Sequence, residues 1–229
     1  MKAVTSIGRS RIDRQQKCIA SWIAAGCEVT AIQSAGETEI LQPHFPGVRF
    51  IETGLVGDLF KRPKLVRISA MINEAPVLIL NSDIEVRASP EVFAERWSDA
   101  GRKEIKVGIR WNEDPVTKKT EMFKWGIYAF LIAPEMIPHL PDIGMTMGCP
   151  AWDYWIPIQL HRLGYRIITQ KQEELIHEDH PKNWTNEDYR IGLDLLSRHY
   201  HLSQRGAAML VQKLTERGSF HQKQRVKRR

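Results

Sequence analysis

The segment PVLILNSDIEV, residues 76–86, places an apolar run directly before three polar side chains, Asn81, Asp83 and Glu85. An apolar run of this length fits a strand buried inside a sheet. Acidic groups at the carboxyl end of such a strand lie where open α/β sheets bind their ligands. Carboxylate oxygens there suit a hard cation such as Mg²⁺ or Mn²⁺, and through it a diphosphate. The same Asn-Ser-Asp sequence also fits a polar turn that closes a core strand.

Strand and helix patterns alternate through the first 85 residues. Residues 2–8, 28–34, 48–53 and 77–80 read as strands, and helical spacing predicts helices over 12–25 and 64–74. In the first helix the residues three or four apart are Ile12, Gln16, Ile19, Trp22 and Ile23, and Gly26 follows the end. This alternation predicts a parallel α/β sheet with right-handed crossovers.

The pattern changes after residue 85. Residues 105–111 and 125–133 read as longer strands without a helix between them, which predicts an antiparallel or mixed section. A helix over 153–163, a strand over 166–170 and a polar loop over 173–183 follow, and then two helices starting near Thr185 and at Ser203. With no repeat and no linker, we expect a single domain over residues 1–217 and a basic, disordered tail over 218–229.

The net charge of +6 lies in the tail. Six basic residues and no acidic ones fall between Arg217 and Arg229, so subtracting them leaves residues 1–216 neutral. A neutral body speaks against extensive nucleic-acid contact, because that affinity follows the number of phosphates neutralised. Besides a solvated end, the tail fits peripheral contact with anionic lipid headgroups. Nothing in the sequence indicates an oligomeric state.

The three cysteines, Cys18, Cys27 and Cys149, are far apart and show no CxxC spacing. This argues for reduced thiols and against a zinc cluster or a disulfide framework. The N-terminal segment lacks the apolar centre of a signal peptide, and no apolar run approaches the roughly 20 residues of a membrane span. We therefore expect a cytoplasmic protein.

Two common nucleotide signatures are absent, since the sequence has neither GxGxxG after the first strand nor GxxxxGK[ST]. A diphosphate would then be held by a metal and side chains. Asp83 is the natural metal ligand, and Asn81 or Glu85 can share the site. The cations of Lys61-Arg62-Pro63-Lys64 surround a predicted helix start, which fits either phosphate contact or a solvated helix face.

Asp153 is a lone carboxylate flanked by Trp152, Tyr154 and Trp155. Apolar surroundings raise the pKa of a carboxyl and make it a usable general base, and the aromatic rings suit stacking on sugars. The alternative is that Asp153 caps the following helix and the tryptophans belong to the core. Further on, His177 and His180 are three apart and can bind a metal, although loop histidines are often surface residues.

Taken in order, these pieces resemble the GT-A-type nucleotide-sugar glycosyltransferases of the nucleotide-diphospho-sugar transferase superfamily. The resemblance rests on the opening strand, the helix with Arg14-Gln15, Ser21-Trp22 and Gly26, and the Asn81-Ser82-Asp83 motif in place of Asp-x-Asp. It implies a Rossmann-like, mixed and mainly parallel sheet flanked by helices, with C-terminal helices. It also implies a divalent cation, Mn²⁺ or Mg²⁺, that bridges the diphosphate of the donor.

The resemblance also implies roles for residues. Asp83 and His177 would bind the metal, with His180 the next choice, and Asp153 would be the base that deprotonates the acceptor hydroxyl, which implies inversion at the anomeric carbon. Thr5, Ser6, Arg11, Asn81, Ser82 and Asp83 would bind the donor. The residues themselves add Glu85 as a metal ligand, Arg62 and Lys64 as phosphate contacts of the donor, and Trp152 and Trp155 as side chains that shape a sugar subsite.

Three alternatives stay open. A nucleotidyltransferase that makes sugar nucleotides uses a similar sheet and carries a glycine-rich basic loop after the first strand. Gly8-Arg-Ser-Arg11 matches that loop only in part. A binding protein would act through the basic tail without catalysis. A catalytically inactive relative would keep the fold, because the first acid of the motif is missing.

Overall fold

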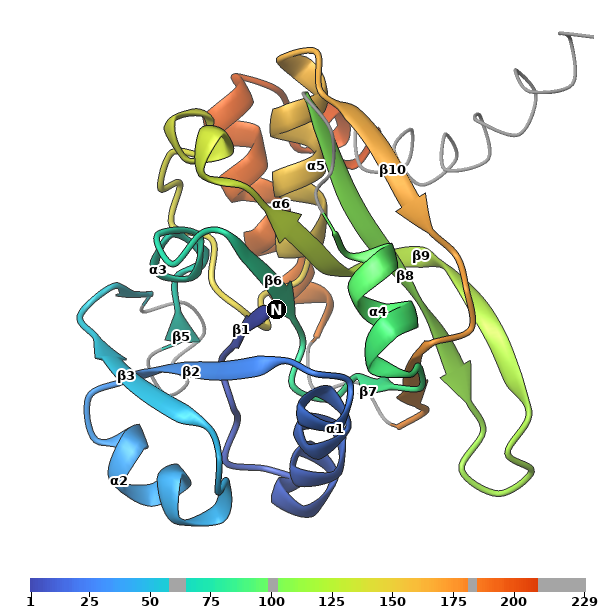
Figure 1. Ribbon diagram of the computed structural model, residues 1–229. Coiled ribbons are helices and arrows are strands. Elements are labelled where there is room, and N and C mark those ends of the chain that lie inside the picture. Colours follow the sequence, from blue (N-terminus) through green and yellow to red (C-terminus); the bar gives the residue numbers. More distant parts are fainter. Residues whose placement is uncertain (58–64, 99–102, 181–184, 210–229) are drawn as a thin grey trace, which may run out of the picture.

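The computed structural model describes residues 1–57, 65–98, 103–180 and 185–209 (Figure 1). The predictions for Arg62, Lys64 and the basic tail lie outside these residues. The second C-terminal helix begins inside them, with helical backbone over residues 204–209.

The chain alternates strands and helices in its first half and is richer in strands in its second. The strands are β1 (Lys2–Thr5), β2 (Glu28–Ser34), β3 (Arg49–Thr53), β4 (Val56–Gly57), β5 (Leu65–Val66), β6 (Val77–Leu80), β7 (Glu85–Val86), β8 (Glu104–Glu113), β9 (Thr120–Ile132), β10 (Arg166–Gln170) and β11 (Leu175–Glu178). The α-helices are α1 (Ile12–Ala24), α2 (Glu37–Leu41), α3 (Ile68–Ile72), α4 (Pro90–Arg96), α5 (Trp152–Arg162) and α6 (Asn186–Tyr200), and two 3₁₀ helices are η1 (Gln42–His44) and η3 (Pro134–His139).

One mixed sheet organises the molecule, in the order β3-β2-β1-β6-β9-β8-β11-β7, with β10 also paired to β8. The pairs among β1, β2, β3 and β6 are parallel, as are those of β8 with β10 and β11. β9 runs antiparallel between β6 and β8, and β7 runs antiparallel to β11. The prediction of a mixed, mainly parallel sheet flanked by helices is therefore confirmed (Figure 1).

The core lies on both faces of this sheet because β6 is buried on both sides. Val77 and Ile79 point into one hydrophobic cluster, which α3, α5 and α6 cover. Leu78 and Leu80 point into the other, which is covered by α1, α2 and α4. A continuous apolar run is the expected sequence of such a doubly covered strand.

Helix α1 buries a different stripe from the one that the sequence predicts. Its buried residues are Gln15, Cys18, Ile19 and Trp22, whereas Ile23 is 40% exposed. This stripe follows the i, i+3, i+4, i+7 spacing of a helix packed on one side. The polar residue on the buried face is thus Gln15 and not Gln16.

Two other predictions of secondary structure are wrong in part. The predicted helix over 64–74 is a short strand, β5, followed by the five-residue helix α3. The predicted polar loop over 173–183 contains β11, a strand with three buried residues. Both elements are too short for a periodic pattern to appear in the sequence.

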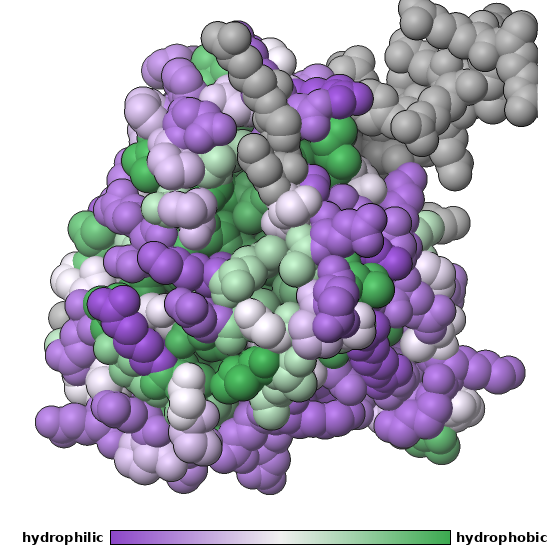
Figure 2. Space-filling model, in the orientation of Figure 1, coloured by the Kyte–Doolittle hydropathy of each residue, from purple (hydrophilic) through white to green (hydrophobic). Residues whose placement is uncertain are grey.

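On the face shown in Figure 2, hydrophobic residues gather in the middle, with hydrophilic residues around them. Among the described residues, no helix combines the length and the apolar character that crossing a bilayer requires.

Candidate functional site

The parallel strands of the sheet end at one edge. β1, β2, β6 and β11 run in the same direction, because β6 and β8 are both antiparallel to β9 and β11 is parallel to β8. Residues 6–10, the turn of residues 81–83 and the segment with His177 and His180 therefore meet where the parallel strands end. This is the edge at which open α/β sheets bind ligands.

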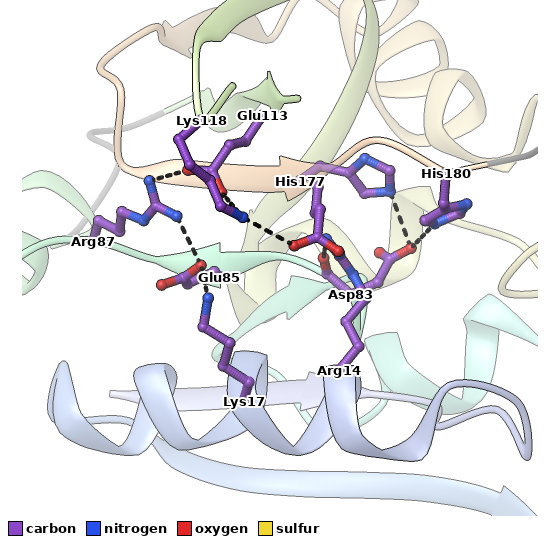
Figure 3. Close-up of polar contacts among 10 residues, drawn as sticks. Arg14, Lys17, Asp83, Glu85, Arg87, Glu113, Lys118, His177 and His180 are labelled. Carbon is purple, nitrogen blue, oxygen red and sulfur yellow. Dashed lines mark hydrogen bonds and ion pairs between the residues drawn. The ribbon is translucent and has the colours of Figure 1, made fainter. Parts of the chain in front are cut away.

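Asp83, His177 and His180 form a compact cluster of ligand atoms at this edge. Oδ2 of Asp83 lies 3.3 Å from Nε2 of His177 and 3.5 Å from Nε2 of His180. The three groups offer one nitrogen or oxygen each within 4.8 Å of one another. Figure 3 shows the Asp83 carboxylate facing both imidazole rings. The structure thus brings His180 as well as His177 to Asp83.

The protonation states of two cluster members suit a cation. Burial alone would raise the pKa of the Asp83 carboxyl, but hydrogen bonds with His177 and His180 outweigh it and hold that pKa well below its usual range. Burial lowers the pKa of His177, against the opposing pull of Asp83. At neutral pH the site therefore offers an ionised carboxylate and a neutral imidazole, the forms that bind metals.

A second observation is compatible with a metal at this place. Oδ1 of Asp83 and Oδ1 of Asn81 are buried and have no hydrogen-bond partner among the described residues. Buried oxygens of this kind are normally paired, so these two are available to a water molecule or to a cation.

Glu85 is not part of this cluster. Its carboxylate accepts from Lys17 at 3.0 Å and from Arg87 at 3.0 Å, and Figure 3 shows it directed toward these two side chains and not toward the two histidines. In an extended segment, side chains two positions apart would point to the same side. Asp83, however, belongs to the turn after β6, and Glu85 is the first residue of β7, so the two side chains need not share a side. The structure places Glu85 in a surface ion-pair network and away from the two histidines.

A cavity of about 460 Å³ opens beside Asp83. Its walls come from residues 6–11, from Arg14 and Gln15 on α1, and from Asn81, Ser82 and Asp83. Of the predicted donor-binding residues outside the motif, Ser6 and Arg11 line this cavity. Thr5 does not, because it is the fully buried last residue of β1.

Asp153 lies close to the same edge, in the first turn of α5. It is 9% exposed, and hydrogen bonds from the backbone at Asp153 and at Ile127 reach its carboxyl. Ile127 precedes Tyr128, whose carbonyl accepts from the backbone N–H of Asn81 at 3.4 Å. Burial raises the pKa of Asp153 to about 7, against these hydrogen bonds and the charge of Arg110. A carboxyl with this pKa is suited to accept a proton at neutral pH.

The N-cap residue of α5 is Ala151, so Asp153 is not the cap. The flanking tryptophans are core residues. Trp152 is 4% exposed and packs its ring against Phe130 at a centroid distance of 5.3 Å, and Trp155 is 1% exposed. The structure therefore places both tryptophans in the hydrophobic core and not beside an open sugar subsite.

Arg110 is a residue of this site that the sequence analysis does not single out. Its guanidinium lies 4.2 Å from the ring centre of Tyr128 and 4.5 Å from that of Phe123. Its charge acts on both Asp83 and Asp153, opposing the rise that burial imposes on each pKa. The available signal is that Arg110 is one of two charged residues, with Lys106, in the strand sequence IKVGIRW, residues 105–111.

The comparisons with known proteins agree on the fold. No protein-family model and no curated protein sequence matches this chain. The structure resembles a mannosyltransferase from Pyrobaculum calidifontis, solved with GDP-Man and Mn²⁺, with a TM-score of 0.51 and 12% identity over 88% of this chain. It also resembles S. aureus TarS, with a TM-score of 0.52 and 13% identity over 96% of this chain.

The chain spans 64% of the mannosyltransferase and 43% of TarS. At these identities the likeness concerns the fold, which both proteins share with this chain over most of its length. Together with the mixed sheet and the cluster at its carboxyl edge, it identifies the chain as one with the fold of the GT-A-type glycosyltransferases.

Proposed function

We propose that this chain is a metal-dependent glycosyltransferase that moves a sugar from a nucleoside-diphosphate sugar to an acceptor hydroxyl. The observation that carries the proposal is the cluster of Asp83, His177 and His180 beside a cavity lined by Arg11 and Arg14. Ligands for a cation next to arginine side chains are what a diphosphate requires. The mannosyltransferase with GDP-Man and Mn²⁺ supports the same chemistry on the same fold.

Asp83, His177 and His180 would hold the cation. Because Mg²⁺ prefers oxygen ligands, two imidazole nitrogens favour Mn²⁺ over Mg²⁺. A bound cation supplies positive charge that stabilises the leaving diphosphate. Ser6, Arg11, Asn81 and Ser82 would contact the nucleotide from the cavity walls.

Asp153 is the proposed general base, because its carboxyl is buried near the turn of Asn81 and has a pKa of about 7. It would take the proton from the acceptor hydroxyl as that oxygen attacks the anomeric carbon. A base that acts directly on the acceptor predicts inversion of configuration. Trp152 and Trp155 have no part in this proposal, since both are packed in the core.

The test is thermal stabilisation of the full chain by UDP, GDP, ADP, CDP and dTDP, each with and without Mn²⁺. A ligand that binds only the folded state at a hundredfold excess over Kd stabilises it by about 2.7 kcal/mol, which a melting curve detects. We expect a Mn²⁺-dependent shift with at least one nucleotide that Asp83→Asn removes. Glu85→Gln is the matched control, because it alters an acid two positions away that pairs with Lys17 and Arg87.

Two results would contradict the proposal. One is the absence of a Mn²⁺-dependent shift with any of the five nucleotides. The other is a shift that survives Asp83→Asn, or that is lost equally in Glu85→Gln. The first result would favour the alternative of a binding protein that acts through its basic tail.

A further inference from the structure

The side chain of Gln15 uses every hydrogen bond that a carboxamide can make. It is 5% exposed. Its oxygen accepts from the backbone N–H of Gly8 at 2.9 Å and from the hydroxyl of Ser82 at 2.7 Å. Its nitrogen donates to the carbonyl oxygens of Gly8 at 2.8 Å and Ser10 at 2.7 Å. Two donors and two acceptor sites are the full capacity of this group.

This arrangement fixes the amide in one orientation. Rotating the carboxamide by half a turn would place its N–H₂ group against the N–H of Gly8 and its oxygen against two carbonyls. Unpaired or repelling polar groups at a buried site are costly, so the four hydrogen bonds act as one unit.

The partners of Gln15 belong to two different walls of the cavity. Gly8 and Ser10 are in the loop after β1, whereas Ser82 is in the turn after β6, immediately before the metal ligand Asp83. Gln15 is therefore a bridge between the loop of residues 8–10 and the turn of residues 81–83.

The neighbouring residue on α1 supports the same turn from its other side. Arg14 forms an ion pair with Glu178 at 2.6 Å, and its second terminal nitrogen lies 3.5 Å from the carbonyl oxygen of Asp83. Glu178 lies between the two histidines of the cluster in sequence. The first turn of α1 thus contacts both the turn of Asp83 and the strand that supplies His177.

We propose that Gln15 is a positioning residue that holds the loop of residues 8–10 and the turn of Asp83 at one separation, so that nucleotide and metal bind cooperatively. The inference rests on the proposed function, in which the nucleoside contacts the loop and the diphosphate reaches the cation. A ligand that spans two walls binds best when their spacing is set in advance. Loosening the bridge would weaken the mutual support of the two ligands.

The experiment compares wild type with Ser82→Ala, which removes the bond across the bridge and leaves the three bonds of Gln15 to the loop. Calorimetry of the full chain gives the Kd of UDP, GDP, ADP, CDP and dTDP with and without Mn²⁺. The ratio of the two Kd values measures the coupling between nucleotide and metal. We expect Ser82→Ala to lower this ratio about fivefold or more. The loss of a direct contact between Ser82 and the nucleotide would weaken binding with and without Mn²⁺ alike, so it would cancel in the ratio.

Gln16→Ala is the matched control. Gln16 neighbours Gln15 on α1, but its amide donates to the carbonyl of His44 at 2.6 Å, away from the cavity. The coupling ratio of this variant should equal that of wild type. If the substitutions acted only on the stability of the fold, the melting temperatures of Ser82→Ala and Gln16→Ala would fall, and the coupling ratios of both variants would equal that of wild type.

Gln15→Glu gives a second measurement. The carboxylate keeps both acceptor bonds but faces the carbonyls of Gly8 and Ser10 without a hydrogen to donate, so nucleotide binding should weaken about tenfold or more even without Mn²⁺. If this variant does not fold, Ser82→Ala decides alone. An unchanged ratio in Ser82→Ala would overturn the role of Gln15 and leave the proposed function standing. A wild type that binds none of the five nucleotides with Mn²⁺ would overturn both.

Discussion

Replacing Asp153 by asparagine should stabilise the protein at pH 8 even though it removes the proposed base. The carboxyl is 9% exposed, and burial raises its pKa from the usual 3.8 to about 7. The folded state therefore binds this proton more tightly than the unfolded state does. Stability is highest below the unfolded pKa and falls as the pH rises through the folded pKa of about 7. Asparagine is neutral at every pH and does not lose this stability.

The size of the effect follows from the difference between the two pKa values. They differ by about three units, from 3.8 to about 7, and each unit corresponds to about 1.4 kcal/mol. The ionised carboxylate therefore costs on the order of 4 kcal/mol at pH 8. The amide nitrogen of the new asparagine needs an acceptor at a place where the backbone offers donors, and leaving it unpaired costs about 2 kcal/mol. The net gain in the free energy of unfolding at pH 8 is therefore about 2 kcal/mol.

Urea unfolding of wild type and Asp153→Asn at half-unit steps from pH 4 to pH 8 measures this directly. Near pH 4, where Asp153 is protonated in the folded state, the variant should be the less stable one because of its unpaired amide. The difference should change steadily between about pH 4 and pH 7, so that the variant becomes the more stable one between about pH 5 and pH 6, and it should level off above pH 7. In parallel, transferase activity of wild type should rise with pH around 7, and the variant should have none.

The reasoning would be refuted by a difference in stability that does not change with pH. It would also be refuted by a variant that is less stable than wild type at pH 8. Either result would mean that Asp153 is not held in the folded protein at a cost, and that its role is structural. Retained activity in a folded Asp153→Asn variant would remove Asp153 from the proposed mechanism.

Three further substitutions test the packing that holds the site. Gly192→Ala would place a Cβ atom 1.9 Å from the carbonyl oxygen of Pro150, so we expect a loss of about 3 kcal/mol or more, visible as a melting temperature well below that of wild type. Trp22→Phe removes the 2.6 Å hydrogen bond from the indole to the carbonyl of Ile84, next to Asp83, and should cost about 2 to 4 kcal/mol in urea unfolding. Thr185→Ala breaks the capping box of α6 and should cost about 1 kcal/mol, with activity retained.

The parts of the fold that the sequence predicts well are those with long or strongly patterned elements. The apolar run before Asn81 is β6, the segment EVTAIQS is β2, and Thr185 caps a 15-residue helix as expected. The short elements β5, α3 and β7 are missed or misread. Their existence depends on partners elsewhere in the chain, which a local pattern does not contain.

The residues of the candidate site also fall into those that the sequence predicts and those that it does not. Asp83 and His177 can be picked out because each ends or follows an apolar strand. Gln15 cannot be picked out in this way. The rotation of α1 about its axis decides whether Gln15 or Gln16 faces inward, and the sequence pattern predicts Gln16, whereas the structure buries Gln15. The tryptophans beside Asp153 show the converse problem. Aromatic residues near a carboxylate fit a sugar subsite and a core equally well until burial is known.

The separation of the cluster along the chain has a consequence for folding. His177 and His180 are 94 and 97 positions from Asp83. An ion joining them would close a loop of nearly half the chain and would act as a reversible cross-link between the turn after β6 and β11. β11 pairs with β7, which ends the sheet, so this cross-link would stabilise one margin of the sheet. Amide hydrogen exchange in β7 and β11 should therefore report cation binding before any sugar or nucleotide is present.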